Sequence, residues 1–247
     1  ELIHAAVAFA TQPIPEGNRV VIITNTGGPA VIATDVMVGA GLTLPPLSDK
    51  TKQVLTETLF PEASVNNPVD VLATGPAAHY RACLDAMMAD DNFDSVYVNF
   101  VTPFFVDNES IAREIVEVSN QQIKPIVCNL MTDRRQWTEV VKILQDGGVP
   151  CFALPGEAAR AMAAMVRYNE IRTRQTGEVT LFDDVDAPKG RKILQKAGKT
   201  GKSSLSAEEV YSILDAYNIP TAGWCMAATV EDAVAEAAKI GYPVVVK

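Results

Sequence analysis

The sequence predicts an α/β protein in which helices cover both faces of a parallel sheet, followed by a linker and a second, smaller α/β unit. Short apolar runs rich in Val and Ile alternate with longer runs of helical apolar spacing from residue 19 to residue 171. This alternation is typical of a parallel sheet that is buried on both faces. The composition then becomes polar and rich in turn-forming residues, and a helical pattern resumes at Ser206.

The first strand is expected at residues 19–25, because this apolar run is bounded by glycines and is too short for a helix. A helix over 28–40 follows, and the alternation repeats to give about five strands. This pattern indicates a flavodoxin-like, doubly wound domain over residues 1–172, with its ligand edge at the carboxyl ends of the strands. The other strands are expected at 69–72, 95–101, 125–130 and 151–153, and the other helices at 76–89, 109–119, 135–144 and 157–171.

Residues 173–204 are interpreted as a linker. Residues 205–247 are interpreted as the truncated start of a different domain, which begins with its first α/β lobe. Ser206 and Glu209 have the spacing of a capping box at the start of a helix. Thr229 is expected to cap a second helix, after which the segment GYP turns into a strand expected at 244–247.

Composition and charge exclude several classes of protein. The 247 residues are 48% hydrophobic with a formal net charge of −9, and the basic stripe of a sequence-independent nucleic-acid binder is missing. No apolar run approaches the roughly 20 residues that cross a bilayer, so we expect a cytoplasmic protein with no nucleic-acid or membrane partner. Four separated cysteines and two histidines indicate neither a metal site nor a disulfide framework.

A pair of glycines between the first strand and its helix is the strongest candidate site. Asn25, Thr26, Gly27 and Gly28 place free backbone N–H groups and the positive end of a helix dipole at one spot. Glycine lets the backbone approach an anion closely, which favours a phosphate or a carboxylate. The alternative is a plain structural turn, and the segment is neither a GxGxxG fingerprint nor a Walker A loop.

Three further polar residues are candidates for phosphate or acyl binding at the same edge of the sheet. Asn67 precedes a proline and Asp70 lies in the next strand, where the alternative is an Asx turn together with an Asp that orients a neighbouring loop. Thr102 follows a buried strand, and after it Phe104 and Phe105 are expected either to line an acyl pocket or to pack in the core.

No catalytic residue is assigned within this chain. His4 and His79 lie in helical patterns without an acid or metal ligand at a meaningful spacing, and no nucleophile motif is present. Lys247 ends an expected strand, where its ammonium is placed to contact a nucleotide, although a surface lysine is the alternative.

Taken together, these segments resemble the NDP-forming acyl-CoA synthetases, the superfamily of ADP-forming acetyl-CoA synthetase and succinyl-CoA synthetase. The resemblance covers nearly the whole chain. It is carried by PEGNRVVIITNTGGPAVIATDVMVGAGL, by PEASVNNPVDVLATG, by PGEAARAMAAMVRYNEIR, and by LSAEEVYSILDAYNIPTAGWCMAATVEDAVAEAAKIGYPVVVK, which is similar to the opening of an ATP-grasp domain.

The resemblance implies an acid–thiol ligase that interconverts acyl-CoA, phosphate and ADP with acid, CoA and ATP through a phosphohistidine. That histidine belongs to a preceding domain, and in the family the helix after the glycine turn points its N-terminus at it, which here maps to residues 25–28. The ATP-grasp lysine maps to Lys247. The resemblance also implies Mg and CoA sites outside this chain, partner domains that complete the enzyme, and a homo-oligomer.

Two other functions stay open on the sequence. The parent protein can be a fusion in which a synthetase-like core regulates an appended acetyltransferase. It can also be a sensing module that binds an acyl-CoA or a small molecule without catalysis. On the leading interpretation, the chain alone is inactive.

Overall fold

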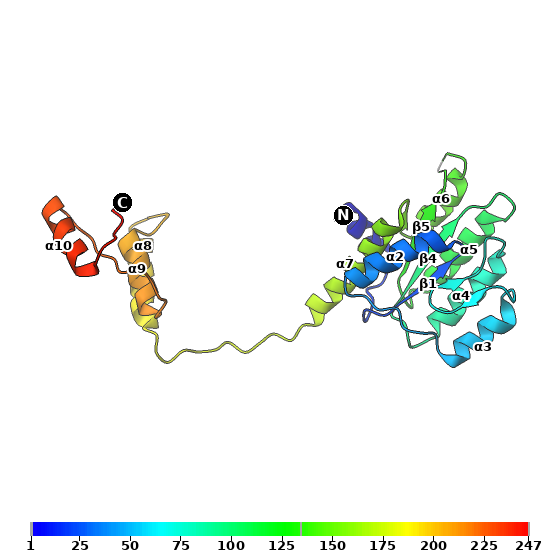
Figure 1. Cartoon of the computed structure of the whole chain (residues 1–247), viewed down its shortest axis with the longest axis horizontal. Helices are drawn as coiled ribbons and strands as arrows, with labels where there is room; N and C mark the ends of the chain where they lie inside the picture. Colours follow the sequence, from blue (N-terminus) through cyan, green and yellow to red (C-terminus); the bar gives the residue numbers. More distant parts are fainter. Residues whose placement is uncertain (1, 134, 247) are drawn as a thin grey trace. The chain divides into compact units, whose positions relative to one another are not determined.

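A computed structural model describes residues 2–133 and 135–246 of the chain. The chain divides into two compact units, Glu1–Gln175 and Thr176–Lys247 (Figure 1). The domain boundaries expected at residues 172 and 204 stay predictions. No helix within the described residues is long and apolar enough to cross a membrane.

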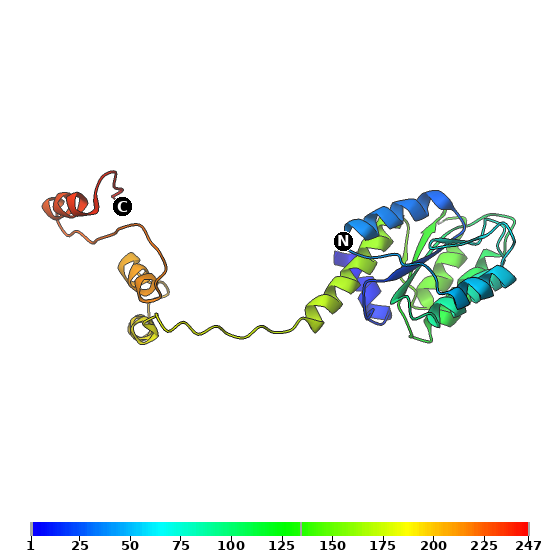
Figure 2. The same ribbon diagram turned by 60° about the horizontal axis from the view of Figure 1, so that its bottom comes forward.

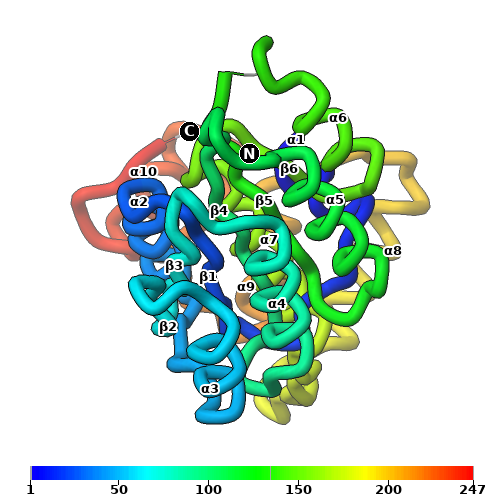
Figure 3. Tube along the Cα trace, turned by 90° about the vertical axis from the view of Figure 1, so that its right-hand side faces the viewer, coloured from blue at the N-terminus to red at the C-terminus, as the bar shows by residue number. Residues whose placement is uncertain are grey.

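The first unit is built on one sheet, which the described residues form from six strands in the order β2-β3-β1-β4-β5-β6 (Figure 3). All neighbouring strands run parallel except β2 and β3, which pair antiparallel. The strands are β1 (Val20–Thr24), β2 (Ser64–Val65), β3 (Val69–Asp70), β4 (Ser95–Val101), β5 (Ile126–Met131) and β6 (Cys151–Phe152). The expected α/β fold with a doubly wound parallel sheet is thereby confirmed.

Helices cover both faces of this sheet (Figure 2). On one face α2 and α1 pack against α7, and on the other α4, α5 and α6 pack in sequence with α3 beside α4. The helices are α1 (Leu2–Thr11), α2 (Gly27–Gly39), α3 (Asp49–Thr58), α4 (Ala77–Met88), α5 (Asn108–Ser119), α6 (Thr138–Asp146) and α7 (Pro155–Thr173). Each face has its own buried apolar core, because strands buried on both sides send alternate side chains to opposite faces.

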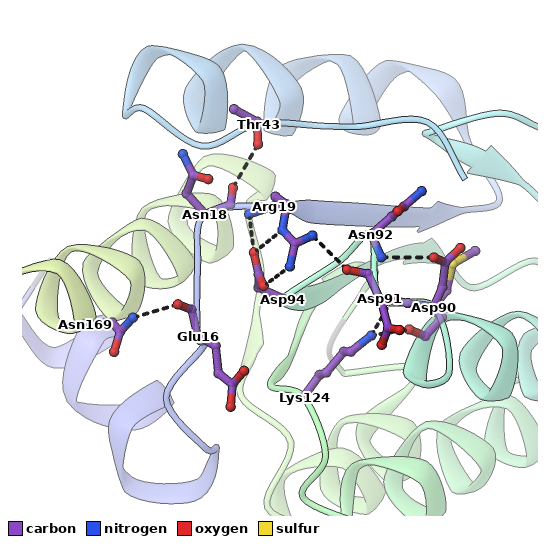
Figure 4. Close-up of polar contacts among 11 residues, drawn as sticks. Glu16, Asn18, Arg19, Thr43, Asp90, Asp91, Asn92, Asp94, Lys124 and Asn169 are labelled. Carbon is purple, nitrogen blue, oxygen red and sulfur yellow. Dashed lines mark hydrogen bonds and ion pairs between the residues drawn. The ribbon is translucent and has the colours of Figure 1, made fainter. Parts of the chain in front are cut away.

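The amino ends of the central strands are held by charged and polar side chains (Figure 4). The Arg19 guanidinium lies 2.6 Å from a carboxylate oxygen of Asp94, and the Lys124 ammonium donates to the carbonyls of Met87 and Asp90 at the end of α4. A cation at the C-terminus of a helix satisfies carbonyls that have no partner within the helix. These contacts therefore stabilise the amino edge of the sheet, which lies opposite to the carboxyl edge.

The second unit consists of three helices in the part of the chain that is described. They are α8 (Ala187–Lys199), α9 (Ala207–Ala216) and α10 (Val230–Ile240). Ser206 and Glu209 form the expected capping box of α9, and the Thr229 hydroxyl caps α10. Helix α8 lies within the predicted linker, where Asp186 caps its start.

Besides α8, three elements differ from the sequence-based expectation. The strand expected at 244–247 is wrong for its described residues 244–246, which form no strand, because a strand needs a neighbouring chain for its hydrogen bonds. Helix α3 and the two-residue strand β2 are not expected from the sequence. Their sequence signal is weak, since α3 is mostly polar and β2 is very short.

Candidate functional site

The turn between β1 and α2 exposes both of its glycines at the carboxyl edge of the sheet. Neither Gly27 nor Gly28 has a positive φ, and a Cβ atom built on either one meets no other atom within 4 Å. Glycine is therefore required here neither by backbone conformation nor by packing within this chain. A structural turn alone gives no physical reason for the pair, whereas close approach of an anion to the backbone does.

The Thr26 residue begins α2 as its N-cap with an extended backbone, φ −156° and ψ 127°. Its hydroxyl makes no capping hydrogen bond to the helix. A threonine that does not cap leaves the first N–H groups of α2 without a side-chain acceptor. These donors and the helix dipole favour a negatively charged group at this end of α2.

Two buried polar side chains fix the turn from below. The Asn25 amide donates to the Val101 carbonyl at 3.1 Å and accepts from the Val101 N–H at 3.0 Å. The Thr24 hydroxyl accepts from the Thr26 N–H and donates to the Thr26 carbonyl. Both side chains hydrogen-bond within the chain and hold the backbone of the turn, and the binding role of Asn25 stays a prediction.

Asn67 and Asp70 occupy different places along the sheet. The Asn67 carboxamide hydrogen-bonds to the backbone of Val20 and Ile22, so it lies beside the first half of β1 and not at the glycine turn. Asp70 pairs with Thr24 in the parallel register at the carboxyl edge. Its carboxylate accepts from the Leu72 N–H at 2.9 Å, so Asp70 orients the loop that follows β3, as the alternative interpretation of the sequence expects.

Thr102 meets a residue that the sequence does not single out. Its hydroxyl hydrogen-bonds to that of Thr132, and the two residues follow the neighbouring strands β4 and β5. Phe104 and Phe105 follow Thr102 in the chain with 86% and 58% of their surface exposed. The alternative of core packing is wrong for these two rings. They contact each other edge to face, with their ring centroids 5.2 Å apart.

Two titratable side chains of the first unit, those of His79 and Cys83, are buried. Burial lowers the pKa of His79. Its ring packs against that of Phe60, with the ring centroids 4.5 Å apart. Burial raises the pKa of the Cys83 thiol to about 12, far from the thiolate form that attacks substrates. The described residues contain no group of three metal-ligating side chains, and Lys247, the predicted nucleotide contact, lies outside them.

The chain belongs to the Ligase-CoA domain family, whose model matches residues 20–176. A second family model, the ATP-grasp domain, matches residues 196–247. The glycine turn, Asp70 and Thr102 all lie within the first match, and Lys247 lies at the end of the second.

The curated relatives of this chain include ADP-forming CoA ligases. The chain is 33% identical to 4-hydroxybutyrate–CoA ligase [ADP-forming] of Nitrosopumilus maritimus, over 100% of this chain and 35% of the relative. It is 35% identical to the alpha subunit of acetate–CoA ligase [ADP-forming] II of Pyrococcus furiosus, over 68% of this chain and 37% of that subunit. The chain thus spans about a third of the length of these relatives.

A crystal structure of a protein from Pyrococcus horikoshii has the same fold. It aligns with a TM-score of 0.65 and 30% sequence identity, over 70% of this chain and 40% of that one. The doubly wound unit is therefore an arrangement already known in nature.

Proposed function

We propose that this chain is part of an acid–thiol ligase that interconverts acyl-CoA, phosphate and ADP with acid, CoA and ATP. The two family matches support a ligase unit followed by a nucleotide-binding unit in one chain. The names of the two relatives support the ADP-forming reaction. The protein is proposed to act in the cytoplasm as a homo-oligomer, with domains outside this chain that carry the phosphohistidine and the CoA and Mg sites.

The site assignment depends on the open space beside Gly27 and Gly28, where a Cβ atom would meet no other atom within 4 Å. We assign the phosphoryl group to this space, where the N–H groups of the first turn of α2 donate to its oxygens. Thr26 can add its hydroxyl, and Asp70 and Thr102 lie at the ends of neighbouring strands. Lys247 is proposed to contact the nucleotide phosphates, where a fixed ammonium offsets their charge.

The test compares two valine variants of the same helix in the full-length protein. Gly28→Val fills the proposed phosphoryl space, whereas Gly39→Val adds the same side chain at the far end of α2, where a Cβ also meets nothing. We expect Gly28→Val to lower acyl-CoA-dependent ATP formation about a hundredfold. Gly39→Val should keep the wild-type rate.

Equal rates in both variants would rule out an anion role for the turn. Thermal unfolding of each variant should be measured beside the rates, because a loss caused by misfolding lowers the unfolding temperature as well. The pair is matched in residue type, helix and open surroundings, so a difference between them reports on the position alone.

A further inference from the structure

Asn99 is a polar side chain in the middle of the buried sheet. It belongs to β4, is 0% exposed, and follows the apolar residues Val96, Tyr97 and Val98. Its Oδ1 atom has no hydrogen-bond partner. A buried carbonyl without a partner is unfavourable, and an apolar side chain would suit this core better. The reason for an asparagine must therefore lie in what its amide nitrogen donates.

The amide nitrogen of Asn99 reaches the glycine turn. It donates to the Thr24 hydroxyl at 2.7 Å and lies 3.4 Å from the Thr26 carbonyl oxygen. The Thr24 hydroxyl in turn donates to the same Thr26 carbonyl at 2.7 Å. Because a carbonyl oxygen only accepts, the atom of Asn99 that faces it must be the nitrogen. Two donors thus hold the Thr26 carbonyl toward the sheet.

Holding this carbonyl fixes the direction of a neighbouring N–H group. The carbonyl of Thr26 and the N–H of Gly27 belong to one planar trans peptide, so they point in opposite directions. With the carbonyl held inward, the Gly27 N–H is directed away from the sheet, toward the exposed side of the turn. The hydrogen bonds from Asn99 and Thr24 therefore set the aim of the first donor of α2.

We propose that Asn99, acting through Thr24, is the positioning residue for the phosphoryl-binding turn. The inference rests on the proposed function, because it takes the α2 N-terminus as the phosphoryl site. Asn99 does not touch the substrate. It keeps the Thr26–Gly27 peptide in one orientation, so that the N–H donor is already in place when the anion arrives.

The chain offers a matched comparison residue in Asn129. It pairs with Asn99 in the register of β4 and β5, is also 0% exposed, and also has an Oδ1 atom without a partner. Its amide nitrogen, however, donates to the Phe152 carbonyl at 3.1 Å and not to the turn. The two residues share chemistry, burial and face, and differ in the group that they hold.

The experiment measures ATP formation by full-length protein carrying Asn99→Ala or Asn129→Ala, with inorganic phosphate and ADP varied separately. We expect Asn99→Ala to lower kcat/KM for phosphate about tenfold and to leave the KM for ADP unchanged. Asn129→Ala should leave both parameters at wild-type values. A merely structural role of Asn99 would instead affect phosphate and ADP alike.

A second set of variants tests the relay without removing Asn99. Thr24→Val deletes the hydroxyl at nearly constant volume and should reproduce the phosphate defect, whereas Thr24→Ser keeps the hydroxyl and should restore the wild-type value. Asn99→Leu keeps a similar volume but has no donor. It should therefore lower kcat/KM for phosphate about as much as Asn99→Ala.

Wild-type phosphate kinetics in Asn99→Ala or in Thr24→Val, or the same loss in the Asn129→Ala variant, would overturn this inference. The outcome is separable from that of the proposed function. If Gly28→Val retains full activity, the phosphoryl site itself is misplaced. If Gly28→Val is inactive while Asn99→Ala is normal, the site stands and only the positioning role fails.

Discussion

Helices in both units of this chain have local sequence signals such as caps, but the two units differ greatly in how many of their residues are buried. The first unit has an apolar core on each face of its sheet. In the second unit, the described residues that are buried are Gly190, Ala197 and Ala216. Helix α10 has no buried residue at all, although Val230 and Val234 lie on it with 75% and 60% of their surface exposed.

This difference shows that helix caps and a buried core contribute differently to the structure. The α9 helix has a complete capping box and α10 has a threonine cap, while α2 in the first unit starts without a side-chain cap. Caps satisfy the free N–H groups at the start of a helix and define where it begins. Tertiary stability comes mainly from buried apolar surface, which the second unit has in small amount among its described residues.

The largest expected effect contrasts two isoleucines. Ile111 on α5 is 0% exposed and Ile240 at the end of α10 is 41% exposed. We expect Ile111→Ala to lower the free energy of unfolding of the first unit by about 2–5 kcal/mol, through lost burial and a cavity. Ile240→Ala should change stability by less than about 0.5 kcal/mol.

Urea unfolding of the 247-residue chain, followed by amide hydrogen exchange in each unit, measures both values. The exchange data assign each loss to its own unit. A large effect of Ile240→Ala would show that α10 is buried in solution, and the contrast between the units would then be broken.

An intermediate effect is expected from the ion pair at the amino edge of the sheet. Burial raises the pKa of Asp94, but hydrogen bonds from the side chain and backbone of Arg19, together with the charges of Arg19 and Lys124, outweigh it and hold the pKa below its usual value. Asp94→Asn should lower the free energy of unfolding at pH 7 by about 1–3 kcal/mol. Glu236→Gln, which breaks an exposed pair with Lys239 on α10, should have no measurable effect.

The pH dependence of this effect has a definite sign. Because the pKa of Asp94 is lower in the folded than in the unfolded protein, its stabilisation is present above the unfolded pKa of about 3.9. The stabilisation is lost as the pH falls through the folded pKa. The urea midpoints of wild type and Asp94→Asn should therefore differ at pH 7 and converge below about pH 4. Parallel curves down to about pH 2 would contradict the assignment.

The smallest expected effect sharpens the comparison within the second unit. A Cβ atom on Gly190 would lie 2.7 Å from the ring of Tyr217, whereas one on Gly198 of the same helix meets nothing within 4 Å. Gly190→Ala should destabilise the packing of α8 by about 1 kcal/mol. Gly198→Ala should stabilise α8 by about 0.5 kcal/mol, because alanine favours the helix.

Hydrogen exchange of the α8 amides measures both changes, with wild type and the two variants compared over the same 247 residues. Protection should fall in Gly190→Ala and rise in Gly198→Ala. If both variants gain protection, the contact between α8 and Tyr217 does not limit the stability of this unit.

The sequence predicts the elements whose signals are local. The strand expected at 95–101 agrees with the structure to the residue, because burial on both faces leaves a mostly apolar run. The Ser206 and Glu209 capping box is also predicted correctly, since it needs four neighbouring residues. The strand expected at 244–247 is wrong for the described residues because its stability depends on a partner strand, which no local pattern can supply.

The same division holds at the candidate site. The glycine turn at Gly27 and Gly28 is visible in the sequence, because a strand, two glycines and a helix occur in direct succession. The hydrogen bond between Asn99 and Thr24 joins residues 75 positions apart, so only the folded sheet brings them together. The one local hint is an asparagine within an otherwise apolar strand.

The sequence by itself determined the fold class and the order of the main strands and helices along the chain. It also determined the presence of a glycine turn between a strand and a helix. Each of these features depends on neighbouring residues and on hydrophobic periodicity. The tertiary structure alone decided that the glycines of this turn are dispensable for the fold, that Asn67 lies away from it, and that Asn99 lies beneath it. These facts depend on the free space around a backbone atom and on contacts across strands, which arise only when distant segments pack together.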